Sequence, residues 1–118
     1  MTLLEELNSL GVNTAEGLSR VMDDSDLYDM MLGMFLDSVQ SNPIAPEEFA
    51  GDLEPVITKV HALKGVAGNL SLTPVFNGYN KTLELLRSGE AETAKREFES
   101  LLPAQEAIIC CIKKHKGL

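Results

Sequence analysis

The sequence has no tryptophan, and only 5% of its 118 residues are aromatic. Leucine, valine, isoleucine, methionine and alanine must therefore fill the interior, and these side chains mostly suit helices packed on helices. No stretch approaches the ~20 apolar residues of a membrane-spanning helix. Residues Met1–Glu6 also lack the basic start and long apolar run of a secretory signal, so we expect a cytoplasmic protein with no membrane partner.

Cysteine and positive charge are scarce as well. Cys110 and Cys111 are the only cysteines, and adjacent cysteines are poorly placed for an intramolecular disulfide, which suits a reducing cytosol. Ten Lys and Arg face 18 Asp and Glu, which gives a formal net charge of −8 and a pI near 4.6. Such a surface repels nucleic-acid phosphates, so we expect no nucleic-acid partner, and any anion site must be a local basic island.

The residues that are present indicate one helical domain. A hydrophobic fraction of 44% is ordinary for a folded chain. A length of 118 residues is enough for one core and too short for two, so we expect residues 1–118 to be a single domain. Apolar residues recur at three- and four-residue steps and never alternate as in a half-buried strand. The pattern predicts an all-α helical bundle.

Turn clusters and prolines divide the chain into segments, and we expect helices over about 3–10, 14–22, 25–41, 52–70, 73–86 and 90–116. Side chains suited to cap them lie in the segment 13–17 for the second helix, at Ser25 or Asp26 for the third, and at Thr73 for the fifth. Pro103 lies inside the last segment and should kink or split that helix. In the segment 25–41 we interpret a group of apolar side chains as core rather than as a partner-binding stripe: Met30, Met31, Met34 and Phe35.

The segment around His61 carries the chemistry. At ~100° per residue its apolar side chains fall within an arc of about 100°, and His61 lies roughly 130° from the centre of that arc. Lys64, Gly65 and Gly68 gather on the side of His61. Each glycine inside a helix costs roughly 0.5–1 kcal/mol relative to alanine. Close approach of another molecule explains two such glycines better than close helix packing, which is the alternative.

A neutral imidazole is a nucleophile, and its titration near neutral pH keeps that form available. Lys64, one turn from His61, places a positive charge where the oxygens of a phosphoryl group on His61 would lie. The alternative is an ordinary solvated lysine. Lys59 points away from His61 on the helical wheel, and we assign it no role.

The sequence His-Ala-Leu-Lys-Gly at 61–65, followed by Gly-Asn-Leu at 68–70, resembles the signature of histidine-phosphotransfer (HPt) domains of two-component phosphorelays. Residues 11–13 and 16–18 resemble the common N-terminal segment of the family, and residues 26–35 resemble its first core helix. The likeness therefore spans nearly the whole chain. The commonest family pattern has glycine where this chain has Ser71. We interpret that departure as minor, because Ser71 lies past the phosphoacceptor surface.

The resemblance implies an up-down four-helix bundle with short N-terminal helices and with His61 exposed midway along the second bundle helix. It implies a phosphocarrier rather than an enzyme: His61 accepts a phosphoryl group from an aspartyl-phosphate receiver domain, of a response regulator or hybrid sensor kinase, and passes it to another receiver. Lys64 stabilises the phosphate, and Gly65 and Gly68 give the receiver access. We expect a monomer, and no cofactor or metal, because nucleotide-binding and metal-loop motifs are absent.

Other interpretations stay open. A helical adaptor could bind a signalling partner through the same face without phosphorylation, and an enzyme could use His61 as a general base, although no second catalytic group can be argued. Tyr79 and Lys81 on the following helix are further candidates for the phosphoryl site. Cys111 and His115 are spaced to share a metal on a helix, but two ligands near a helix end are too few.

Overall fold

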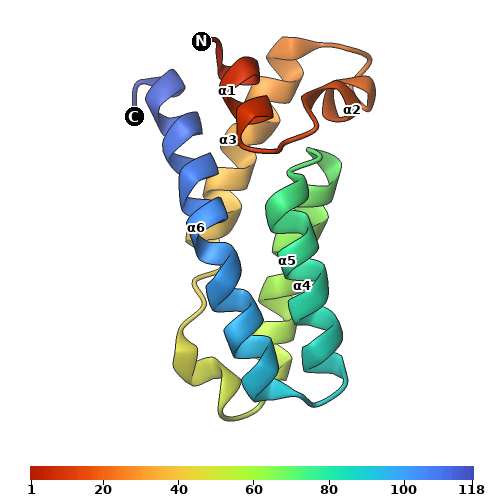
Figure 1. The fold of residues 1–118 in the computed structure, drawn as a ribbon, viewed down its shortest axis with the longest axis vertical. Coiled ribbons are helices and arrows are strands. Elements are labelled where there is room, and N and C mark those ends of the chain that lie inside the picture. The colour runs from red at the N-terminus through yellow and green to blue at the C-terminus, as the bar shows by residue number, and fades with distance from the viewer.

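A computed structural model describes all 118 residues and contains only helices, which confirms the expected all-α class. The chain forms six α-helices and one short 3₁₀ helix, and Figure 1 shows how the α-helices are arranged. In chain order they are α1 (Leu3–Ser9), α2 (Thr14–Ser19), α3 (Ser25–Ser41), η1 (Pro46–Phe49), α4 (Glu54–Asn69), α5 (Thr73–Arg87) and α6 (Ala91–Lys116). The 3₁₀ helix lies in the connection between α3 and α4, which contains Pro43 and Pro46.

The long helices run along the long axis of a molecule that measures 41 × 26 × 22 Å. With 26 residues and a rise of about 1.5 Å each, α6 spans nearly that whole length. α5 packs most extensively on α6 and α4, and α3 packs mainly on α4. α1 lies against the last turns of α6, at the end of the molecule that holds both termini (Figure 1). None of the helices combines the length and the apolar character that crossing a bilayer requires.

The helix starts follow the expected segments to within a residue or two. The Asn13 side chain accepts a hydrogen bond from the Glu16 amide, as expected for the cap of α2. The cap of α3 is Asp24 instead of Ser25 or Asp26, and its carboxylate accepts two backbone amides at 3.1 Å each. An aspartate at this position satisfies two of the amides that have no partner within the helix.

One further expectation about a helix boundary is wrong, and one of the two alternatives for Pro103 is excluded. Leu72 occupies the N-cap position of α5, and Thr73 is already helical, its hydroxyl donating to the Ser71 carbonyl. Pro103 does not split the last segment, because α6 is continuous from Ala91 to Lys116. A proline inside a helix removes its own amide from the hydrogen-bond ladder and crowds the carbonyl four residues back. The buried side chains on both sides of Pro103 nevertheless hold α6 against the core.

The core consists of 25 buried hydrophobic residues drawn from every helix except α2. α4 buries the stripe that its periodicity predicts, including Val56, Val60, Leu63 and Ala67. On α3, Phe35 is buried as expected, but Met30 and Met34 are 58% and 55% exposed, so their assignment to the core is wrong. The inward face of α3 is already filled by other side chains, which leaves the side that carries both methionines in solvent.

Candidate functional site

His61 lies midway along α4 on its solvent side, as the helical wheel predicts. The neighbouring Val60 and Leu63 are buried and fix the rotation of the helix about its axis. His61 is exposed, and its imidazole takes part in none of the side-chain hydrogen bonds or ion pairs of the structure. An exposed imidazole on a rigid helix is accessible to a large reaction partner.

Lys64 and Gly65 flank His61 on the same side of α4. Lys64 is half-buried and forms none of the five ion pairs, unlike Lys59, Lys114 and Lys116. Residues three apart on a helix have Cβ atoms about 5–6 Å apart, so the Lys64 ammonium can reach a group attached to His61. A Cβ atom added to Gly65 would meet no atom within 4 Å. The surface beside His61 therefore combines an uncommitted positive charge with bare backbone.

Gly68, one turn further along α4, has a different environment. A Cβ atom there would lie 3.0 Å from Cε1 of Phe76, so the absence of a side chain lets α5 approach α4 closely. The Gly68 carbonyl also accepts a hydrogen bond of 3.0 Å from the Arg20 guanidinium. Close helix packing, the alternative raised for both glycines, thus holds at Gly68 but not at Gly65. Receiver access at Gly68 remains a prediction.

Arg20 and Ser71 form a polar cluster at the end of α4 that the sequence analysis missed. The Arg20 guanidinium donates to the Ser71 hydroxyl and to the Glu16 carboxylate, the latter at 2.9 Å, and the Ser71 hydroxyl donates to Glu16 at 2.7 Å. Glu16 thus accepts hydrogen bonds from Ser71 and from Arg20. These bonds, chiefly the one from Ser71, hold the pKa of Glu16 below its usual value. Only the four-residue spacing of Glu16 and Arg20 was visible in the sequence.

The cluster borders a cavity of about 350 Å³ whose lining is mostly polar: Asn13, Glu16, Arg20, Gly68, Ser71, Thr73, Phe76 and Asn77. Gly68 belongs both to this lining and to the side of α4 that carries His61. The exposed surface of α4 thus runs from His61 past Gly65 to a hollow that contains a partly exposed arginine.

The following helix supplies one exposed candidate and one buried residue. Tyr79 is fully buried, and its hydroxyl donates to the Gln105 side chain on α6. Burial raises the pKa of the Tyr79 phenol, and the residue is part of the core instead of the phosphoryl site. Lys81 is exposed, makes no ion pair and remains a candidate.

Lys59 does not face His61, as expected, but it has a structural role that the sequence analysis did not give it. Its ammonium lies 2.8 Å from the Glu48 carboxylate and 2.6 Å from the Pro43 carbonyl oxygen. Lys59 therefore ties α4 to η1 and to the loop that follows α3. The contrast with Lys64 is clear, because only Lys64 keeps its charge uncommitted beside His61.

Comparisons with protein-family models, curated proteins and solved structures gave no match to this chain. The side chains around His61, and the motif that they form, are therefore the basis for assigning a function.

Proposed function

We propose that this chain is a histidine-phosphotransfer domain, a phosphocarrier without kinase activity of its own, in which α3 to α6 act as an up-down four-helix bundle. The observation that carries the proposal is the surface of α4. It presents an exposed, unpartnered His61 imidazole beside an unpaired Lys64 and the open backbone of Gly65. The sequence motif at 61–70 supports the same function.

The proposed reaction is a reversible transfer. A nitrogen of neutral His61 attacks the phosphorus of an aspartyl phosphate on a receiver domain, so that a P–N bond forms as the P–O bond to the aspartate breaks. The bonding electron pair leaves with the aspartate carboxylate. The Lys64 ammonium offsets negative charge on the phosphoryl oxygens, and most of the catalysis comes from the receiver and its divalent metal ion. A second receiver removes the group by the reverse reaction.

The receiver interface of this proposal is a helix-face contact centred on His61 and Gly65. Transient signalling contacts are commonly small, below about 1,200 Å² of total buried surface. The bare backbone at Gly65 lets the receiver's aspartate come close to the imidazole without a side chain in between. The polar hollow beside Arg20 includes Gly68 in its lining, so in this proposal it borders the interface.

The test is intact mass spectrometry at neutral or alkaline pH after the chain is mixed with several phosphorylated receiver domains. His61 and His115 are the only histidines, so His115→Gln is the matched control for His61→Gln. We expect one acid-labile phosphoryl group on the wild type and on His115→Gln, and none on His61→Gln. Circular dichroism establishes that each variant is folded.

Two outcomes contradict the proposal. The first is a folded wild type that takes no phosphate from any receiver shown to be charged. The second is a phosphoryl group that persists in His61→Gln. An adaptor that works without phosphorylation would keep its partner binding in His61→Gln, so a binding measurement on the same variant separates the two functions.

A further inference from the structure

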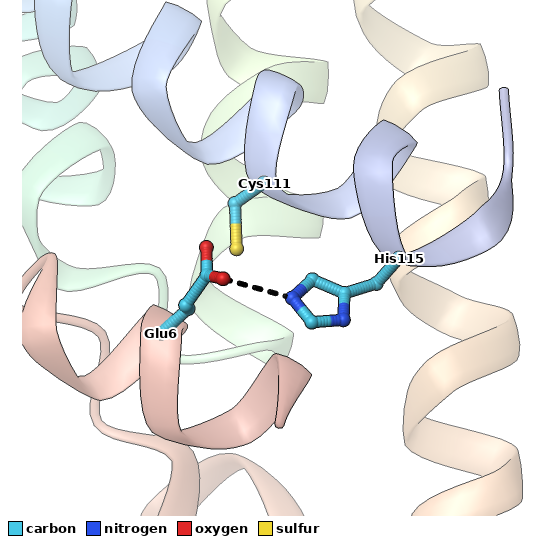
Figure 2. Close-up of side chains that lie close together, drawn as sticks. All are labelled: Glu6, Cys111 and His115. Carbon is cyan, nitrogen blue, oxygen red and sulfur yellow. Dashed lines mark hydrogen bonds and ion pairs between the residues drawn. The ribbon is translucent and has the colours of Figure 1, made fainter. Parts of the chain in front are cut away.

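Three potential metal ligands meet at the end of the molecule that holds both termini. Figure 2 shows Glu6 of α1 pointing toward Cys111 and His115, which lie one turn apart on α6. One ligand atom from each residue lies within 4.8 Å of the other two. Oε1 of Glu6 and Nε2 of His115 are 3.1 Å apart.

The third ligand could not be found from the sequence. The spacing of Cys111 and His115 indicated two donors on one helix face, which is too few for a stable site. Glu6 joins them only because α1 packs against the last turns of α6. We propose that Glu6, Cys111 and His115 bind a zinc ion that fastens α1 to the C-terminal end of α6.

The donor set and its geometry favour zinc. A thiolate, an imidazole and a carboxylate are the ligand types that Zn²⁺ takes in proteins, and soft thiolate ligands disfavour Mg²⁺ and Ca²⁺. Bonds of about 2.0–2.3 Å in a tetrahedron place the ligand atoms roughly 3.3–3.8 Å apart. The Glu6–His115 pair is already near that separation. From the 4.8 Å limit, the Cys111 sulfur needs to close by about 1.0–1.5 Å at most.

The fourth position has room for a water molecule. A cavity of about 230 Å³ opens beside the cluster, lined by Glu6, Ser9, Leu10, Ala107, Cys110, Cys111 and Lys114. It gives the ion a path to a sulfur that is otherwise buried, since Cys111 is only 4% exposed. Three protein ligands and one water form the open type of zinc site.

The Lys114 ammonium already lies beside the Glu6 carboxylate. The Lys114 ammonium lies 2.6 Å from Oε1 of Glu6, and this lysine is exposed enough to swing into solvent. Zinc therefore replaces an ammonium ion as the partner of the Glu6 carboxylate. The Cys111 S–H bond breaks as the Zn–S bond forms, and the proton leaves to solvent. Zn²⁺ with one thiolate and one carboxylate is neutral overall, which suits a partly buried position.

The test is a titration of the full chain, first stripped with a chelator, using Zn²⁺ in calorimetry and Co²⁺ as a spectroscopic probe. We expect one ion per chain and a thiolate-to-cobalt charge-transfer band. Glu6→Gln and Cys111→Ser should each weaken zinc binding by more than about 100-fold, which is the upper end of the loss caused by removing an outer-shell partner. Zinc should also raise the melting temperature of the wild type.

Cys110→Ser is the matched control, because Cys110 lines the same cavity but lies outside the three-ligand cluster. Its zinc affinity should equal that of the wild type. Lys114→Gln should bind zinc more tightly, since the competing ammonium is gone.

Three results would overturn the proposal: no binding to the wild type, equal losses in Cys110→Ser and Cys111→Ser, or full affinity in Glu6→Gln. If Cys111→Ser does not fold, Glu6→Gln and the cobalt spectrum of the wild type still decide the question.

Discussion

Replacing Gly65 by alanine should make the protein more stable and phosphoryl transfer slower. The new methyl group would meet no atom within 4 Å, so no packing penalty opposes the better helix propensity of alanine. The expected gain is about 1 kcal/mol in the free energy of unfolding. For a chain of this size that gain raises the melting temperature by about 3–6 °C. The same methyl group occupies the surface through which a receiver would approach His61.

The assay pairs chemical denaturation with the rate of phosphoryl transfer from a charged receiver. Gly33→Ala is the matched control, because Gly33 also lies inside a helix and its added Cβ would be 3.6 Å from the nearest atom, an ordinary contact. Gly33→Ala should gain similar stability without a change in transfer rate. Gly65→Leu should slow transfer further than Gly65→Ala, since its side chain extends beyond the methyl group.

Gly78 gives the opposite case for stability. An added Cβ at Gly78 would lie 2.7 Å from Leu101 side-chain atoms at the contact of α5 and α6. Gly78→Ala should therefore destabilise the protein by about 1–3 kcal/mol.

A destabilised Gly65→Ala would refute the open environment of Gly65. Equal transfer rates in Gly65→Leu and Gly33→Ala would refute its place in the receiver interface.

Lys64→Gln should slow phosphoryl transfer about tenfold, equivalent to about 1.4 kcal/mol, whereas Lys95→Gln should not; equal rates in single-turnover measurements would contradict the role of Lys64. Tyr79→Phe should cost about 0.5–1.5 kcal/mol in urea unfolding, because it loses a hydroxyl hydrogen bond, and should leave transfer unchanged. The Lys59 ammonium holds the pKa of Glu48 below its usual value of 4.5. The contribution of Glu48 to the free energy of unfolding is therefore complete above pH 4.5 and is lost as the pH falls through the lower pKa of the folded state. Unfolding measured from pH 6 to 3 should show a weaker pH dependence in Glu48→Gln than in the wild type.

The helical segments were predictable because amphipathic periodicity is a local property of the sequence. The stripe of α4 that contains Val60 and Leu63 is buried as predicted, and His61 consequently faces solvent. The exact residue that caps α3 could not be predicted from the sequence. Polar side chains that can cap occupy every position from 23 to 26, and the backbone conformation at Asp24 decides among them.

The methionines of α3 show where periodicity fails. Met30 and Met34 are one turn apart and next to the apolar arc, so the sequence pattern includes them in the core. The width of the buried arc depends on how many neighbours surround the helix. α3 packs mainly on α4 and less on α2 and α6, and these contacts are satisfied by its inward face, where Phe35 lies. Tertiary packing of this kind is not encoded within the helix itself.

The candidate site likewise contains features set by local helix geometry and features set by helix packing. The relation of His61 to Lys64 is set by helix geometry and can be read from their spacing alone. The contacts of Arg20 with Gly68 and of Glu6 with His115 join residues 48 and 109 positions apart, and only the packing of the helices creates them. Local chemistry was therefore accessible from the sequence, but the polar hollow and the proposed zinc site were not.

Ser71 combines a local backbone conformation with contacts that only helix packing creates. Its φ of +55° is in the left-handed region that favours glycine, the residue type commonly found here in the resembled family. A serine there carries a conformational cost of order 1 kcal/mol, and its hydroxyl, bonded to Arg20 and Glu16, offsets that cost. The departure at Ser71 is thus linked to α2, because without those two partners a serine would only strain the end of α4. Ser71→Gly should therefore remove the two hydroxyl hydrogen bonds and the backbone strain together, while Arg20 keeps its bond to the Gly68 carbonyl.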